Sequence, residues 1–127
     1  MGCMKHVVLA LGAAALAPAA MAQEPVKIGI VTFLSGPAAA PFGVPARNAA
    51  EFVIGELNAG KAPAPYGKKG FGGAPLEMVI VDEAGSTTTQ VTEFRNLVQR
   101  QNVGLVVGYV SSGNCLAIAP EIGRAHV

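Results

Sequence analysis

The stretch VKIGIVTF, residues 26–33, is almost wholly apolar and rich in β-branched side chains, as expected of a strand that is buried on both faces. Residues 76–81 and 104–110 form two further runs of the same character. A turn and a stretch with helical periodicity follow each of the three runs. Strands that alternate with helices predict a parallel sheet with right-handed crossovers. The sequence therefore predicts an α/β fold, an open parallel sheet with flanking helices.

Local patterns predict where the helices begin and end. Gly60 is placed to end the first helix in the usual C-terminal role. Thr87-Thr-Thr-Gln90 resembles a capping box at the start of the second helix. The third helix is expected from residue 116. The predicted buried stripes are Ala46, Ala49, Ala50, Val53 and Leu57 in the first helix, and Val91, Phe94, Leu97 and Val98 in the second.

In open parallel sheets, ligands bind beyond the carboxyl ends of the strands. The loops expected there are residues 34–43, 82–87 and 110–114. In the third loop, hydroxyl groups and the free N–H groups of a helix start suit an anion such as a carboxylate. The alternative is that Ser112 or Asn114 simply caps the helix. Asp82 and Glu83 are adjacent and should point in different directions, so Asp82 is expected to brace its loop rather than to form a catalytic pair.

Enzyme signatures are mostly absent from the sequence. No dinucleotide fingerprint follows the first strand, and there is neither a P-loop nor a nucleophile elbow. The only histidines are His6 and His126, which leaves no base for a serine triad and no histidine metal site in the core of the chain. We therefore expect no enzymatic activity, no cofactor and no metal.

Two further classes of function are excluded by composition and charge. The formal net charge is +1, and no basic run is longer than Lys68-Lys69, whereas nucleic-acid binding needs concentrated positive charge. Residues 1–22 have the three-part pattern of a secretory signal peptide, and their apolar core is too short to span a bilayer. The chain is thus predicted to be exported to the periplasm, and cleavage after residue 22 would leave Cys115 as its single cysteine.

Several quoted pieces resemble a known family. Residues 26–33, then Leu34-Ser35-Gly36-Pro37, then Phe42-Gly43 before a helix that ends in residues 56–60, are similar to the opening of the periplasmic branched-chain amino acid binding proteins. These are the type I solute receptors of bacterial ABC importers. Asp82-Glu83, residues 92–98 and residues 106–112 agree with the same pattern, and the resemblance covers residues 24–120.

The resemblance implies a protein that clamps a solute between two α/β lobes and performs no chemistry. Phe42 matches the aromatic position of the first loop, and Val110, Ser111 and Ser112 match the segment that holds the ligand carboxylate. A disulfide often ties the second loop to the third in the amino-acid binders, but Gly85 and Ser111 stand at those positions here. Cys115 stands four residues later and is a candidate for a bridge to a cysteine beyond the present end of the chain.

The last seven residues, 121–127, break the apolar helical pattern. They also correspond to codons that resemble read-through into a common short-read sequencing adapter. We therefore interpret residues 1–22 as a signal peptide, residues 23–120 as a partial N-terminal ligand-binding lobe, and residues 121–127 as an artefact.

The leading hypothesis is the N-terminal part of an exported solute-binding protein that captures an amino acid or similar small carboxylate for an ABC importer. Its partners would be the solute and the permease subunits in the membrane. One alternative is a periplasmic ligand sensor of the same fold. The other is an exported α/β hydrolase whose catalytic residues follow residue 120.

Overall fold

The computed structural model describes residues 23–123, so the predicted signal peptide lies outside the described residues. Within this range the chain alternates strands and helices, as the sequence predicts. Two single π-helical turns accompany the α-helices: η1 leads into α1, and η2 extends α2. In chain order the elements are β1 (Val26–Thr32), η1 (Ala39–Gly43), α1 (Val44–Ala59), β2 (Leu76–Asp82), α2 (Thr87–Arg95), η2 (Asn96–Arg100), β3 (Leu105–Gly108) and α3 (Ser112–Ile122).

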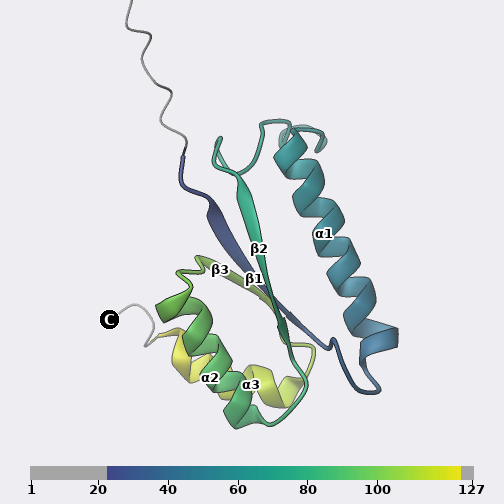
Figure 1. The fold of residues 1–127 in the computed structure, drawn as a ribbon, viewed down its shortest axis with the longest axis vertical. Coiled ribbons are helices and arrows are strands. Elements are labelled where there is room, and N and C mark those ends of the chain that lie inside the picture. The colour runs from purple at the N-terminus through teal and green to yellow at the C-terminus, as the bar shows by residue number, and fades with distance from the viewer. Residues whose placement is uncertain (1–22, 124–127) are drawn as a thin grey trace, which may run out of the picture.

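The three strands form one parallel sheet in the order β2-β1-β3, which confirms the predicted fold class. In this register Val26 lies opposite Leu76, and Ile28 lies opposite Leu105. Helix α1 lies on one side of the sheet, and α2 and α3 lie together on the other (Figure 1). The crossover through α1 leads from β1 to β2 on one side, and the crossover through α2 leads from β2 past β1 to β3 on its other side. The topological switch point is therefore between the carboxyl ends of β1 and β3.

The hydrophobic core lies between the sheet and the helical segment formed by α2 and η2. Val31 and Leu97 are fully buried there and pack with Val103. Gly29 permits this packing, because a Cβ on it would lie only 3.2 Å from Val103 Cγ1. The predicted stripe of α2 is confirmed: Phe94 and Leu97 are buried, and Val91 and Val98 are half-buried.

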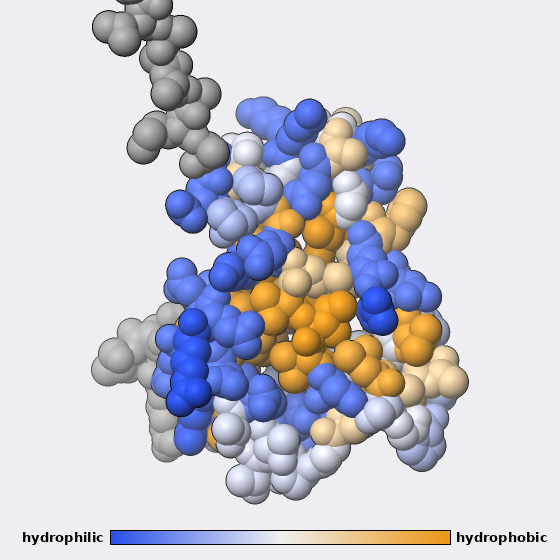
Figure 2. Space-filling model, in the orientation of Figure 1, coloured by the Kyte–Doolittle hydropathy of each residue, from blue (hydrophilic) through white to orange (hydrophobic). Residues whose placement is uncertain are grey.

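The α1 side is packed less closely than the sequence predicts. None of the residues of α1 is buried among the described residues, and Val53 is 52% exposed. The predicted stripe instead lines one wall of an open apolar groove of about 370 Å3, whose floor is formed by the sheet. Figure 2 shows apolar side chains gathered on the viewed face beside α1. The helical period of this stripe was predicted correctly. Its burial was not, because these side chains border an open groove. The groove is lined by Ile28, Ile30, Ala46, Ala49, Ala50, Val53, Ile54, Leu57, Leu105 and Val107.

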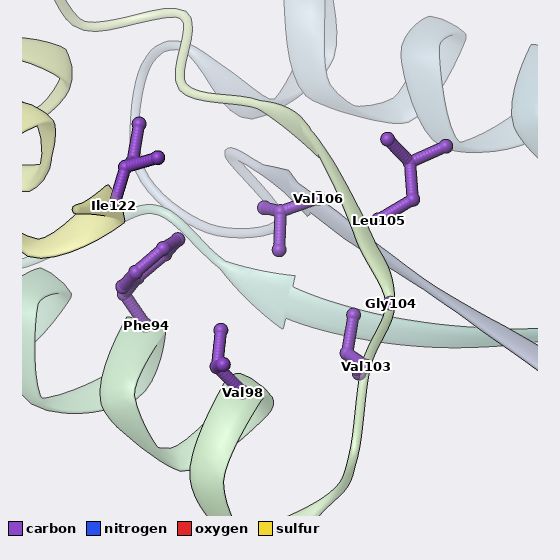
Figure 3. A pocket seen from close by; sticks show the side chains of 7 residues that line it. All are labelled: Phe94, Val98, Val103, Gly104, Leu105, Val106 and Ile122. Carbon is purple, nitrogen blue, oxygen red and sulfur yellow. The ribbon is translucent and has the colours of Figure 1, made fainter. Parts of the chain in front are cut away.

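A second apolar hollow, of about 200 Å3, lies on the other side of β3. Phe94 from α2, Val98 from η2 and Ile122 from α3 approach Val106 there (Figure 3). Leu105 points to the opposite side of the strand in the same view. The alternation follows from the two-residue period of a strand, and it gives both faces of β3 an apolar character.

The structure confirms one predicted helix end and corrects two starts. Gly60 ends α1 with φ +69°, the left-handed conformation that glycine adopts without strain. Helix α2 is capped by Ser86 rather than by Thr87, because the Ser86 hydroxyl accepts a hydrogen bond from Thr89 N–H. Helix α3 begins at Ser112, four residues before the predicted start, and Ser111 caps it.

The predicted break of the helical pattern at residue 121 is not found, because α3 continues to Ile122. Glu121 is buried, and Arg95 of α2 donates to its carboxylate with distances of 2.7 and 3.0 Å. This contact joins α3 to α2. The origin of residues 121–127 in a sequencing adapter stays a prediction.

Asn58 fastens the amino end of the sheet. Its side-chain amide donates to Leu76 O and accepts from Leu76 N–H, both at 2.8 Å. The amide thus continues the ladder beyond the first residue of β2 and holds that strand to the end of α1. The glycine- and proline-rich loop of residues 60–75 passes over this end of the molecule, away from the carboxyl ends of the strands.

Candidate ligand-binding site

The loops that follow β1, β2 and β3 meet at one edge of the sheet, as predicted. They are joined by the acidic residues at the end of β2. The carboxylate of Asp82 binds the first loop, and that of Glu83 binds the third. Because β1 lies between β2 and β3, Glu83 reaches across the end of the central strand. The two adjacent side chains therefore point in different directions, in agreement with the sequence-based expectation.

Asp82 braces its own loop through Ala84, as predicted, and it also binds the first loop, which the sequence did not predict. Its carboxylate accepts hydrogen bonds from Leu34 N–H at 2.8 Å, from Ser35 Oγ at 2.6 Å and from Ala84 N–H at 3.0 Å. Burial alone would raise the pKa of Asp82, but the hydrogen bonds from Ser35, Ala84 and Leu34 outweigh it, and the pKa lies below its ordinary value. Asp82 is therefore ionised at neutral pH and holds the chain as it leaves β1.

Glu83 is fully buried and holds the third loop. Its two carboxylate oxygens accept from Val110 N–H and Ser111 N–H, each at 2.7 Å, and Asn114 Nδ2 lies 3.3 Å from one of them. These donors surround the start of α3, where the helix dipole favours a negative charge. The sequence predicted this position as a place for an anion, and in the structure an internal carboxylate fills it.

Gln90 holds the backbone on both sides of Glu83. Its Nε2 donates to the carbonyl oxygens of Asp82 and Ala84, both at 3.1 Å, and the side chain is fully buried. The expected capping box is therefore not formed, because Gln90 turns back to the second loop instead of to its own helix start. The missed signal was a glutamine placed one turn inside an amphipathic helix on its buried side.

The end of β3 adopts an unusual backbone. Gly108 has φ +142°, and a Cβ on it would overlap the Val31 carbonyl oxygen. Tyr109 then has φ +63°, and its N–H donates to that same oxygen at 3.1 Å. Burial, followed by the negative charges of Glu83 and Glu93, raises the pKa of Tyr109 to about 12. Gly108 and Tyr109, both with positive φ, end the four-residue strand β3 and direct the chain toward Glu83.

The structure separates the roles of the predicted site residues. Val110 presents its backbone N–H to Glu83 and leaves its side chain 48% exposed. Ser111 donates its N–H to Glu83, while its hydroxyl accepts from Asn114 N–H at 3.4 Å as the helix cap. The cap is therefore Ser111, not Ser112 or Asn114. Ser112 is exposed, and its hydroxyl has no partner among residues 23–123.

Phe42 lies on η1 with 58% of its surface exposed. The next residue, Gly43, passes so close to the Phe33 carbonyl oxygen that a Cβ would overlap it. This close approach turns the first loop back on the end of β1 and presents Phe42 outward. The structure therefore brings the first and third loops to the same edge through Asp82 and Glu83.

Cys115 is exposed and forms no disulfide within the described residues, so a bridge to a cysteine beyond residue 127 stays a prediction. In the described part of the chain, no three potential metal ligands among histidine, cysteine, aspartate and glutamate come together. Residues 23–123 also contain no helix long and apolar enough to span a bilayer. Hydrogen-bond donors and apolar surface are what this edge of the sheet offers a ligand.

A family model described as a periplasmic binding protein matches residues 25–127. The chain belongs to this family. The match confirms the resemblance found in the sequence, and this family binds solutes rather than transforming them, in agreement with the prediction that the chain is not an enzyme. A search of curated proteins finds no match.

Solved structures of periplasmic binding proteins share the fold. The branched-chain amino acid substrate-binding protein LivJ from Streptococcus pneumoniae, in complex with isoleucine, is 29% identical, with a TM-score of 0.68 over 82% of this chain and 27% of that one. An ABC transporter substrate-binding protein from Sphaerobacter thermophilus is also 29% identical, with a TM-score of 0.59 over 82% and 25% of the two chains. A solute-binding protein from R. palustris in complex with 4-hydroxybenzoate is 19% identical, with a TM-score of 0.59 over 80% and 25%. The periplasmic binding protein chain described here thus spans about a quarter of the length of these neighbours.

Proposed function

We propose that this chain is part of an exported solute-binding protein that captures an amino acid or a similar small carboxylate between two lobes. The solute would be delivered to the permease subunits of an ABC importer. Family membership and the likeness to LivJ, which is described in complex with isoleucine, support this function. The signal-like residues 1–22 favour export to the periplasm by way of a cleaved signal peptide.

The observation that carries the proposal is that the Ser112 hydroxyl is exposed and has no partner among residues 23–123. This residue opens α3 at the switch point between β1 and β3, where α/β sheets bind their ligands. Its hydroxyl is exposed and without a partner, and the first N–H groups of a helix have no acceptor within the helix. A carboxylate at this position would gain both sets of hydrogen bonds and the favourable field of the helix dipole.

The four predicted site residues then have unequal roles. Ser112 makes the polar contact to the ligand carboxylate, and Phe42 offers an exposed ring to the apolar part of the ligand. Val110 contributes its half-exposed side chain. Ser111 acts indirectly, because its N–H and hydroxyl are already engaged by Glu83 and by the helix start.

The test is a calorimetric titration of the full-length protein with isoleucine and with 4-hydroxybenzoate. We expect Ser112→Ala to raise the Kd of the bound solute about tenfold, the loss of one hydrogen bond to a charged group, while the melting temperature stays unchanged. The matched control is Ser86→Ala, which removes the cap of α2 and costs about 1 kcal/mol of stability without touching the site. An unchanged Kd in Ser112→Ala would refute the role of Ser112.

A further inference from the structure

Glu83 differs from the other carboxylates in how it is buried. It is 0% exposed, whereas Glu121, the other buried carboxylate of the described residues, is 7% exposed and is paired with Arg95. Glu83 has no basic partner among the ion pairs of residues 23–123. Within residues 23–123, its carboxylate accepts hydrogen bonds from the N–H groups of Val110 and Ser111 and from the side-chain amide of Asn114. A carboxylate removed from water in this way is tolerated only when donors replace its hydration.

The donors come from one short segment, residues 109–114, which we call the ligand loop. The bonds from Val110 and Ser111 span 27 and 28 residues of sequence and are the shortest hydrogen bonds between the second and third loops. Asn114 adds a link to the Glu83 carbonyl oxygen at 3.4 Å. These contacts fix the ligand loop before any solute arrives. They also occupy two backbone donors that would otherwise attract an external anion.

We infer that Glu83 is the positioning residue of the ligand loop and that it directs the acidic group of the solute outward, to Ser112 and Gly113. Its carboxylate accepts from the inner N–H groups of Val110 and Ser111, and the Ser111 hydroxyl accepts from Asn114 N–H, so the N–H groups of Ser112 and Gly113 and the Ser112 hydroxyl remain. Glu83 does not touch the solute. Because this role matters only if the ligand loop binds a solute, it rests on the function proposed above.

Glu83→Gln is the informative substitution. A glutamine keeps the length of the side chain, but its Nε2 is a donor and would face one of two backbone N–H donors, so only one bond to the loop can be retained. Glu83→Asp keeps the charge and shortens the reach, so it loses contact with at least one amide. The matched control is Asn58→Ala, which removes two side-chain hydrogen bonds at the opposite end of the sheet.

Two readouts are needed in the full-length protein. Amide hydrogen exchange across residues 109–114, measured without solute, reports how firmly the ligand loop is held. Titration with isoleucine and 4-hydroxybenzoate reports binding. For Glu83→Gln we expect exchange of the ligand loop to accelerate about tenfold and the Kd to rise about tenfold, because one hydrogen bond to a charged group is lost. Asn58→Ala should lower the melting temperature and leave both readouts unchanged.

Three results would separate the possibilities. If exchange in the ligand loop is unchanged in Glu83→Gln, or if it accelerates while the Kd stays that of the wild type, the positioning role is overturned. If Asn58→Ala raises the Kd as much as Glu83→Gln, the effect is one of general stability, and the role is again overturned. If the wild-type protein binds neither solute, the proposed function fails first and does so without any variant. Should Glu83→Gln not fold, Glu83→Asp decides by the same criteria.

Discussion

The two ends of the sheet are fastened by side chains of different chemistry. At the amino end, the neutral amide of Asn58 makes one donor and one acceptor bond to the backbone of Leu76, and both partners are satisfied. At the carboxyl end, Asp82 and Glu83 accept five hydrogen bonds from backbone N–H groups and Ser35 within 3.0 Å. The first arrangement closes the ladder of a strand. The second fixes loops in space and concentrates donors and charge at an edge where Ser112 stays open.

The difference lies in which polar groups each end of the sheet leaves open. The Asn58 amide and the backbone groups of Leu76 satisfy one another, so none of them is left for a ligand. Carboxylates instead organise whole loops through backbone N–H groups, and the outermost donors of the third loop remain available. Substitutions at the two ends should therefore differ in kind as well as in size.

The largest effect is expected from Gly108→Ala at the carboxyl end of β3. The added Cβ would overlap the Val31 carbonyl oxygen, and the φ of +142° is strained for any residue with a side chain. We expect a loss of about 3 kcal/mol or more in the free energy of unfolding, measured by denaturant titration. Gly104→Ala, at the amino end of the same strand, is the control, since nothing described lies within 4 Å of its Cβ. Equal losses in the two variants would contradict the distinction.

An intermediate effect is expected from Asn58→Ala. Two hydrogen bonds are removed and the backbone groups of Leu76 lose their partners, so the free energy of unfolding should fall by about 1–3 kcal/mol. Because the substitution lies at the amino end, the affinity for a solute should not change. A stability loss that came with weakened binding would show that the two ends are coupled.

The smallest effect is expected from Asp82→Asn, and it should depend on pH. The folded-state pKa of Asp82 is lowered from 3.8 by its hydrogen bonds, so the stabilisation is present above that value and is lost as the pH falls through the folded pKa. The melting temperature of the wild type should therefore exceed that of Asp82→Asn at neutral pH. The difference between the two values should begin to shrink as the pH falls below about 4. A constant difference over this range would show that the charge of Asp82 does not contribute.

Much of the fold could be predicted because its signals are local. The apolar runs, the periodicity of α1 and α2 and the position of Gly60 each depend on residues within a few turns of one another. The starts of the helices were predicted less accurately. Serine and threonine are both good N-cap residues, so residue type does not choose between Ser86 and Thr87 or between Ser111 and Ser112. The cap is the residue whose backbone is extended, and this depends on contacts that the loop makes with distant parts of the chain.

The candidate site was predicted only in outline. The sequence placed the serines at the carboxyl end of the sheet, where the structure has them, and the family resemblance assigned Val110, Ser111 and Ser112 together to a ligand carboxylate. It could not show that Glu83, 27 residues away, already binds two of those backbone donors. A pair of adjacent acidic residues has the same local signature whether it faces a ligand, a metal or its own backbone.

The sequence by itself determined the alternation of strands and helices, the parallel sheet and the position of three loops at one edge, because these follow from periodicity and chain connectivity. Only the tertiary structure decided which donors at that edge remain open and that the apolar stripe of α1 borders a groove. Burial and hydrogen bonding depend on groups far apart in the chain. Their outcome is set by how the elements pack and not by the pattern of any one of them.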